Sequence, residues 1–261
     1  MTRRKKALLL GVAGAAAVAF VAALHVAPSA WEVCAGETNR LFNVVGAWLA
    51  CAALFAAGAA VGRGARVPWN LLAAALALIA FAEAVTAYFL VVRDIAVPQL
   101  WFLNFVFLGA YAVTIAALVC KARSLPFTIF PLLKPVLIFL ATVVFAYVFY
   151  YVVRIASSSA AMPGVAKILM LIFPVTDYFM LVLAVYVCAS YGRGVAGRPW
   201  MVVALGVLFI ALSDLIGGFS AAAADKGRAY VDLALIAQFV GYVAMAWGAW
   251  FQRALLKDAD A

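Results

Sequence analysis

The sequence contains few charged residues, a single histidine and no CxxC pair of cysteines, and each of these shortages excludes a class of protein or site. Asp, Glu, Lys and Arg make up 11% of the 261 residues, whereas soluble proteins average about 25%, so a soluble globular domain is excluded. The single histidine, His25, excludes haem held by two histidines and metal sites built from several. The four cysteines form no CxxC motif, so no zinc or redox motif is indicated. We therefore expect no metal and no cofactor.

Patterns of catalysis and of nucleic-acid binding are also missing. The serines at 157–159 lack a second histidine that could act as their base. The GRG sequences at 62–64 and 192–194 lack the lysine and the spacing of a phosphate-binding loop. The net charge of +9 is not gathered into the basic face that nucleic acid requires. We expect a protein that is not an enzyme and has no nucleic-acid partner.

Long apolar runs are abundant, and 70% of the residues are hydrophobic. Runs of about 20 apolar residues are typical of transmembrane helices, and they lack the alternation of a membrane β-barrel. The sequence therefore predicts an all-α integral membrane protein, with the lipid bilayer as its first partner. Eight spans are predicted, at 7–26, 42–61, 69–92, 100–120, 136–154, 165–191, 200–219 and 231–251.

The distribution of Lys and Arg predicts the orientation of these spans. With a cytoplasmic N-terminus, 13 of the 19 basic residues lie on the cytoplasmic side and 6 on the outer side, as the positive-inside rule requires. The chain is predicted to be a multi-pass protein of the inner (plasma) membrane with both termini in the cytoplasm. The basic start and the run 7–26 also suit a signal peptide, but Pro28 disrupts the cleavage pattern, and we interpret 7–26 as a span.

The chain also contains an internal duplication. Equivalent residues are separated by 131 positions, as in the pairs Trp69 and Trp200, Glu83 and Asp214, Asp94 and Asp225, and Tyr111 and Tyr242. An even number of spans in each unit gives two parallel four-helix repeats, predicted at 1–123 and 136–261 with an interfacial linker at 124–135. The paired tryptophans are expected in the aromatic belt at the cytoplasmic interface.

Three acids lie within the predicted spans, namely Glu83, Asp177 and Asp214. At 1.5 Å per residue, all three are about 21 Å from the cytoplasmic ends of their spans and therefore at one level. A carboxylate at the bilayer centre costs about 2.5–3.5 kcal/mol on insertion scales. Each acid should therefore face the bundle, hold a proton or have a partner. We expect no Lys or Arg at this level and therefore hydroxyl or amide partners.

Equal spacings predict the partners of two of these acids. Glu83 and Tyr111 are 28 residues apart, as are Asp214 and Tyr242, so we expect one hydrogen-bonded pair within each repeat. Such pairs would either clamp helices together or form part of a functional site, and both interpretations stay open.

Asp177 differs because it has no acidic counterpart in the first repeat. It follows Pro174 by three residues, and a proline kink beside a lone acid often marks a cavity. The predicted ligand-binding or proton-relay residues are Asp177, Asp214, Glu83, Tyr111, Tyr242 and Tyr178.

The last part of the chain resembles the membrane-embedded sensor regions found at the N-termini of bacterial diguanylate cyclases and sensor kinases. The resemblance rests on FPVTDYFMLVLAVYV at 173–187, on Trp200 followed by Asp214, and on the pair Gly241-Tyr242. It implies a signalling role in the membrane. Such regions precede a catalytic output domain, so a separate partner would have to supply the output here.

We expect a non-enzymatic, sensor-like module that binds a small apolar or weakly polar ligand, or a membrane protein partner, near Asp177 and Asp214. A homo-oligomer is a further possibility. The alternative is a small-solute or proton-coupled transporter that uses the same acids, because intramembrane carboxylates can relay protons. An integral-membrane lipid enzyme ranks third.

Overall fold

The structure is a computed structural model that describes residues 32–93, 102–124, 133–158, 164–190, 197–220 and 227–259. Within these ranges the regular secondary structure is entirely helical, as predicted. The helices are α2 (Glu32–Ala60), α3 (Arg63–Arg93), α4 (Leu103–Arg123), α5 (Leu133–Ser158), α6 (Gly164–Ser190), α7 (Arg198–Ser220) and α8 (Gly227–Ala259).

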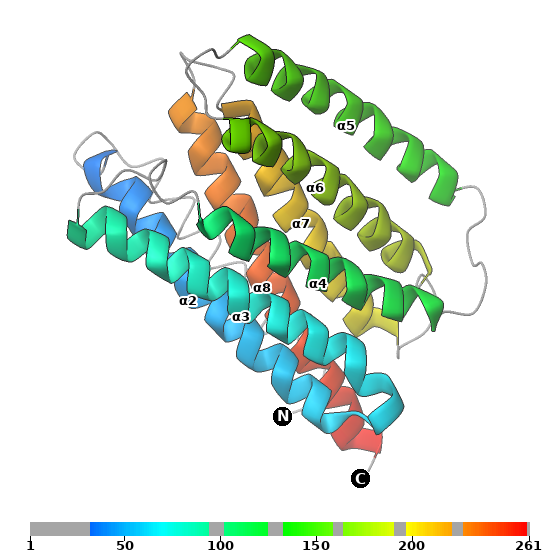
Figure 1. Ribbon diagram of the computed structural model, residues 1–261. Helices are drawn as coiled ribbons and strands as arrows, with labels where there is room; N and C mark the ends of the chain where they lie inside the picture. Colours follow the sequence, from blue (N-terminus) through cyan, green and yellow to red (C-terminus); the bar gives the residue numbers. More distant parts are fainter. Residues whose placement is uncertain are drawn as a thin grey trace.

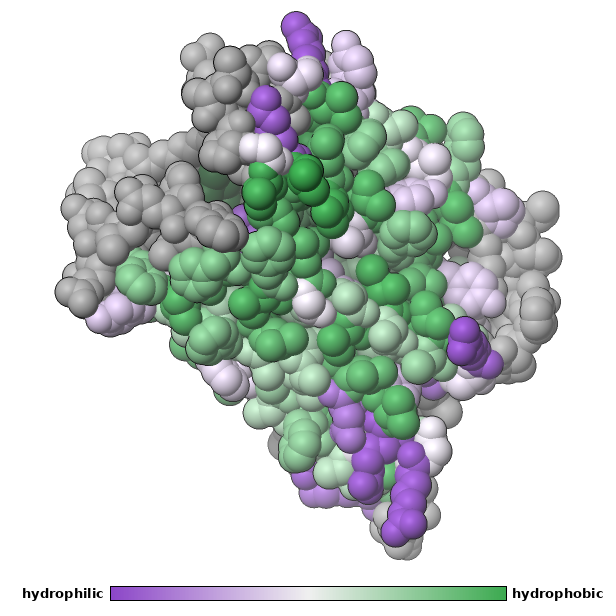
Figure 2. Space-filling model, viewed as in Figure 1, coloured by the Kyte–Doolittle hydropathy of each residue, from purple (hydrophilic) through white to green (hydrophobic). Residues whose placement is uncertain are grey.

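Six of the described helices are long and apolar enough to cross a membrane, namely α2, α3, α4, α6, α7 and α8. The surface agrees with this: Figure 2 shows hydrophobic side chains over the middle of the molecule and hydrophilic ones toward its ends. Large apolar side chains on this surface are well exposed, with Phe55 at 64% and Phe139 at 66%, as lipid contact allows. The chain is therefore a polytopic membrane protein. The predicted span 7–26 lies outside the described residues, as do most of the linker 124–135 and the second GRG sequence.

Several helices extend beyond the predicted spans. α2 begins at Glu32 rather than at 42, and α8 continues to Ala259 rather than ending at 251. The prediction followed hydrophobicity alone, whereas a helix continues through polar residues until its backbone hydrogen bonds are interrupted. α3 likewise begins at Arg63, five residues before Pro68, which lies inside the helix and removes one backbone hydrogen bond without ending it.

The six candidate spanning helices form a ring. In order around the ring, α2 contacts α3, α3 contacts α4, α4 contacts α6, α6 contacts α7, α7 contacts α8, and α8 returns to α2. α5 lies outside the ring, mainly against α6 (Figure 1). The interior of the ring is thereby shared by helices from the first and the second half of the chain.

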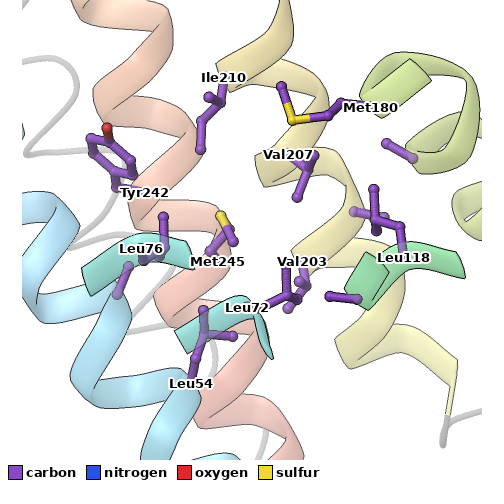
Figure 3. Packing of buried hydrophobic residues seen from close by; sticks show 14 of the residues in the cluster. Leu54, Leu72, Leu76, Leu118, Met180, Val203, Val207, Ile210, Tyr242 and Met245 are labelled. Atoms are coloured by element: carbon purple, nitrogen blue, oxygen red, sulfur yellow. The ribbon is translucent and has the colours of Figure 1, made fainter. Parts of the chain in front are cut away.

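The middle of the ring is filled by an apolar core. Leu72 and Leu76 of α3, Leu118 of α4, and Val203 and Val207 of α7 are all nearly inaccessible. Figure 3 shows these side chains pointing toward one another from different helices. These side chains form an apolar layer between the two ends of the ring. Of the residues labelled in Figure 3, only Tyr242, at the edge of this layer, carries a polar group.

One end of the ring, here called the tryptophan end, is closed by Trp69 of α3 and Trp200 of α7. Their ring centroids are 4.4 Å apart, and the Nζ of Lys121 lies 5.0 Å from the centroid of Trp200. The tryptophans are only 1% and 2% exposed. The prediction of an interfacial aromatic belt for these two residues was therefore wrong, because they pack against each other inside the ring.

α7 and α8 approach each other so closely that glycine is required at their contact. A Cβ at Gly206 would lie 2.6 Å from the carbonyl oxygen of Gly241, and one at Gly248 would lie 2.7 Å from that of Pro199. Small residues permit such backbone contacts between membrane helices. This approach fixes α7 and α8, and with them the acid and the amide that they carry into the ring.

Candidate functional site

A layer of buried polar side chains lies inside the ring. The hydroxyl of Tyr111 on α4 donates a hydrogen bond to Oδ2 of Asp214 on α7, at 2.5 Å. Tyr111 is 5% exposed, and its ring meets that of Phe173 on α6 edge to face, with centroids 5.7 Å apart. Beside Asp214, the hydroxyl of Ser213 donates to the backbone carbonyl of Ala234 on α8. These contacts link α4, α6, α7 and α8.

Glu83 of α3 belongs to the same layer but has a different partner. The amide nitrogen of Gln238 on α8 donates to Oε1 of Glu83 at 3.0 Å and to the hydroxyl of Tyr242 at 2.8 Å. The amide of Asn43 on α2 donates in turn to the side-chain oxygen of Gln238 and to the carbonyl of Leu235, both at 3.3 Å. Because Glu83 and Gln238 are both buried, this network ties α2, α3 and α8 together.

These contacts overturn the pairing predicted within each repeat. Tyr111 bonds to Asp214, not to Glu83, and Glu83 reaches Tyr242 through Gln238. The Tyr111–Asp214 and Glu83–Gln238 bonds therefore join the first half of the chain to the second, whereas the Gln238–Tyr242 bond lies within α8. The spacing of 28 residues gives the depth of a residue along its helix, and this was enough to place these groups in one layer. It does not give the direction in which each side chain points around the ring.

Asp177 on α6 is buried beside the Tyr111–Asp214 pair. Its side chain is 2% exposed, and it is close enough to Asp214 and Tyr111 for their charges to interact. Among the residues that the structure describes, its Oδ1 has no hydrogen-bond partner, which is costly for a polar atom in an apolar interior. The structure thus brings Asp177, Asp214, Glu83, Tyr111 and Tyr242 into one region.

Beside this layer, the ring helices line an open cavity of about 350 Å³. It lies at the end opposite the tryptophans, because its lining includes the ends of several spans, among them Arg40, Gly217 and Val231. All six ring helices contribute to the wall. The lining residues are Arg40, Glu83, Asn104, Phe107, Tyr111, Phe173, Ser213, Asp214, Gly217, Val231, Ala234, Leu235 and Gln238.

Sequence reasoning missed several residues of this site. Arg40 was counted among the six outer basic residues and not considered as part of a site, but it lines the cavity. Asn43 was not considered, although an amide within a predicted span is a signal of the same kind as a carboxylate. Phe107 and Phe173 gave no signal, because apolar residues in a span face lipid or the interior equally well.

Tyr178, the sixth predicted site residue, does not join the cluster. Its hydroxyl lies 2.8 Å from the hydroxyl of Thr142 on α5, and its ring is tilted against that of Phe145 with centroids 4.6 Å apart. It therefore connects α6 to α5 outside the ring.

Replacement Tyr178→Phe is expected to have a small effect, because it removes a single exposed hydrogen bond and keeps the ring. We expect a loss of about 0.6 kcal/mol in the free energy of unfolding, measured by denaturant titration in detergent micelles, and unchanged ligand binding. A change in binding would contradict the assignment of Tyr178 to the α5–α6 contact.

Within the described ranges, no three His, Cys, Asp or Glu side chains come together in an arrangement that could hold a metal ion. Of the three acids in the polar layer, Glu83 and Asp214 are each bonded to a partner on another helix. What the arrangement offers is a set of acceptors, amides and aromatic rings around a small cavity.

Comparison with known proteins finds no matching family model, no matching curated sequence and no matching solved structure. The fold and the site therefore define the class by themselves: a polytopic membrane protein whose spanning helices surround a buried acidic layer and a cavity at one end.

Proposed function

We propose that this protein is a membrane sensor module that binds a small ligand in the cavity beside the acidic layer. The observation that carries the proposal is the wall of that cavity, to which every helix of the ring contributes. A volume of about 350 Å³ falls in the range of small-molecule sites, about 300–1,000 Å³. A ligand there touches all six helices, so its binding energy can shift their relative positions.

The two ends of the ring differ, and this difference supports access of the ligand from one side of the membrane. The apolar core and the Trp69–Trp200 contact lie between the cavity and the opposite end of the ring. With the orientation proposed from the 13 cytoplasmic and 6 outer basic residues, the tryptophan end is cytoplasmic and the cavity opens outward. The site then receives ligand from outside the inner membrane, while both termini stay in the cytoplasm.

The arrangement of helices supports the proposed internal repeat. The counterparts in the two repeats are α2 and α6, α3 and α7, and α4 and α8. If each helix is exchanged with its counterpart, the order of helices around the ring stays the same. Trp69 and Trp200, which are equivalent in sequence, meet each other, as residues at a two-fold axis do. Two parallel repeats related by an axis along the membrane normal would place the cavity on that axis, at the interface between the repeats.

Signal output is proposed to come from a partner. The sensor-like sequence at 173–187 lies on α6, which also contacts α5 at the edge of the molecule. α5 presents Phe139, Val143 and Tyr147 at its surface, each half or more exposed. A membrane protein partner or a second copy of the chain can be accommodated on this side without disturbing the ring.

The test is native mass spectrometry of the chain extracted from its membrane in mild detergent. We expect a small bound molecule that Asp214→Asn releases and Tyr178→Phe retains. Protein that carries no small molecule, and whose melting temperature does not respond to any added metabolite fraction, would contradict ligand binding.

A proton-coupled transporter is the second candidate, and Asp177 is the observation that favours it. A buried carboxyl group with an unpartnered oxygen beside Asp214 is suited to hold and release a proton on a relay that runs through Tyr111. The layer also lies between an open end and a closed end of the ring, as alternating access requires.

Flux measurements separate the two candidates. If the protein is a sensor, liposomes containing it should show no proton or solute flux above empty liposomes, and Asp177→Asn and Asp214→Asn should change nothing. Flux that both substitutions abolish would overturn the sensor proposal. If both variants bind ligand and unfold like the original chain, neither acid has a special role.

A further inference from the structure

The two halves of the chain differ most in what surrounds their buried acids. Gln238 follows Phe107 by 131 residues, the same interval that separates Glu83 from Asp214. Gln238 gives Glu83 an amide donor at 3.0 Å. The equivalent position in the first half is Phe107, which lines the cavity together with Asp214 and has no hydrogen-bond donor. Asp214 accepts from Tyr111 and also borders the cavity.

The charges around the cavity are divided unequally in the same way. The charge of Arg40 acts on Glu83, and both residues line the cavity. Asp214 is the remaining charged residue of the lining. Asp177 is a second acid nearby, outside the lining; it is 2% exposed, and its Oδ1 has no hydrogen-bond partner among the described residues. A buried carboxylate without a counter-charge is costly. Among the described lining residues, α4, α6 and α7 offer Asp214 no Lys or Arg, so a proton or a bound cation has to balance its charge.

The same wall is aromatic. Phe107, Tyr111 and Phe173 all line the cavity, and the last two meet edge to face at an angle of 81°. Faces of aromatic rings attract ammonium groups, by about 0.5–2 kcal/mol depending on desolvation. A carboxylate beside three aromatic rings therefore suits a cation with an apolar body better than a neutral molecule or an anion.

We propose that the cavity takes a small organic ammonium cation of the alkylamine or arylalkylamine class, with its nitrogen at Asp214 and its apolar part against Phe107 and Phe173. This inference rests on the proposed function, because it names the ligand class of that site. Glu83, which accepts from Gln238 and shares the cavity wall with Arg40, positions α3 and α8 and does not receive the cation.

Three molecules of matched shape test the charge requirement: 2-phenylethylammonium, 2-phenylethanol and phenylacetate. Binding is measured by calorimetry with the full chain in lipid nanodiscs. We expect the ammonium to bind at least about tenfold more tightly than the alcohol, which corresponds to about 1.4 kcal/mol, and phenylacetate to bind least.

Two variants test the assigned residues. Asp214→Asn keeps an acceptor for Tyr111, and it should weaken ammonium binding about tenfold while leaving the alcohol unchanged. Phe107→Gln copies the amide of the other half beside Asp214, so it should retain or raise the melting temperature while reducing ammonium binding. Tyr178→Phe, outside the ring, is the control and should bind like the original chain.

The outcomes separate this inference from the proposed function. Equal or tighter binding of the alcohol or of phenylacetate supports a ligand site but overturns its preference for cations. If the ammonium compound does not bind, the cation assignment is also overturned. Native mass spectrometry of the extracted protein then shows independently whether any ligand occupies the cavity. Unchanged ammonium affinity in both Asp214→Asn and Phe107→Gln would remove these residues from the site.

Discussion

Replacement Gly206→Leu is expected to prevent α7 and α8 from packing and to give the largest loss of stability in the chain. The new Cβ would lie 2.5 Å from Cγ of Met245 and 2.6 Å from the backbone oxygen of Gly241. Backbone cannot move aside without separating the helices, so we expect a loss of about 3 kcal/mol or more in the free energy of unfolding. Unfolding by SDS in mixed micelles measures this loss, and size-exclusion chromatography reports the yield of folded protein.

The matched control is Gly109→Leu on α4, where a Cβ would meet no atom within 4 Å. This position is exposed, and leucine favours the helix more than glycine does, by about 1 kcal/mol. Stability should be unchanged or raised. Equal stability of the Gly206 and Gly109 variants would contradict the close approach of α7 and α8.

Replacement Gln238→Leu is expected to have the second largest effect, because one amide serves Glu83, Tyr242 and Asn43 at once. Hydrogen bonds within membrane proteins contribute about 0.6–1.7 kcal/mol each, so the loss of three should cost about 2–5 kcal/mol. The same SDS titration measures it. The substitution also removes the hydrogen bond between α8 and α3. The helices should then separate more often, and the chain should be cleaved more readily by protease than the original chain.

A double-mutant cycle provides the control. Adding Glu83→Leu to Gln238→Leu removes the acid that the first change leaves unpaired, so the double variant should be more stable than the sum of the two single losses predicts. Glu83→Gln, which keeps an acceptor for Gln238, should cost little. Fully additive losses would show that the Glu83–Gln238 bond does not connect the helices.

Much of the fold could be predicted from hydrophobicity because the bilayer imposes one length on every span. The runs at 200–219 and 165–191 lie within a residue or two of α7 and α6. The start of α2 and the end of α8 were missed because they leave the apolar layer, where hydrophobicity no longer marks the helix. The lengths of helices in water depend on local hydrogen bonding, which a transfer scale does not contain.

The site could be predicted only in part, for a geometric reason. Counting residues along a helix gives depth, and depth correctly grouped Glu83, Asp177 and Asp214. The direction of a side chain around the ring depends on how neighbouring helices pack, and for that reason Tyr111 was assigned to the wrong acid. The interior position of Trp69 and Trp200 escaped prediction for the same reason.

The bond between Glu83 and Gln238 spans 155 residues of sequence, which has a consequence during synthesis of the chain. At about 5–20 residues per second, the ribosome needs about 8–30 s after making Glu83 before it makes Gln238. During that interval Glu83 has been made without its donor Gln238, and Tyr111 without its acceptor Asp214. The first half of the protein is therefore synthesised before the donor that completes the hydrogen bonding of Glu83 exists.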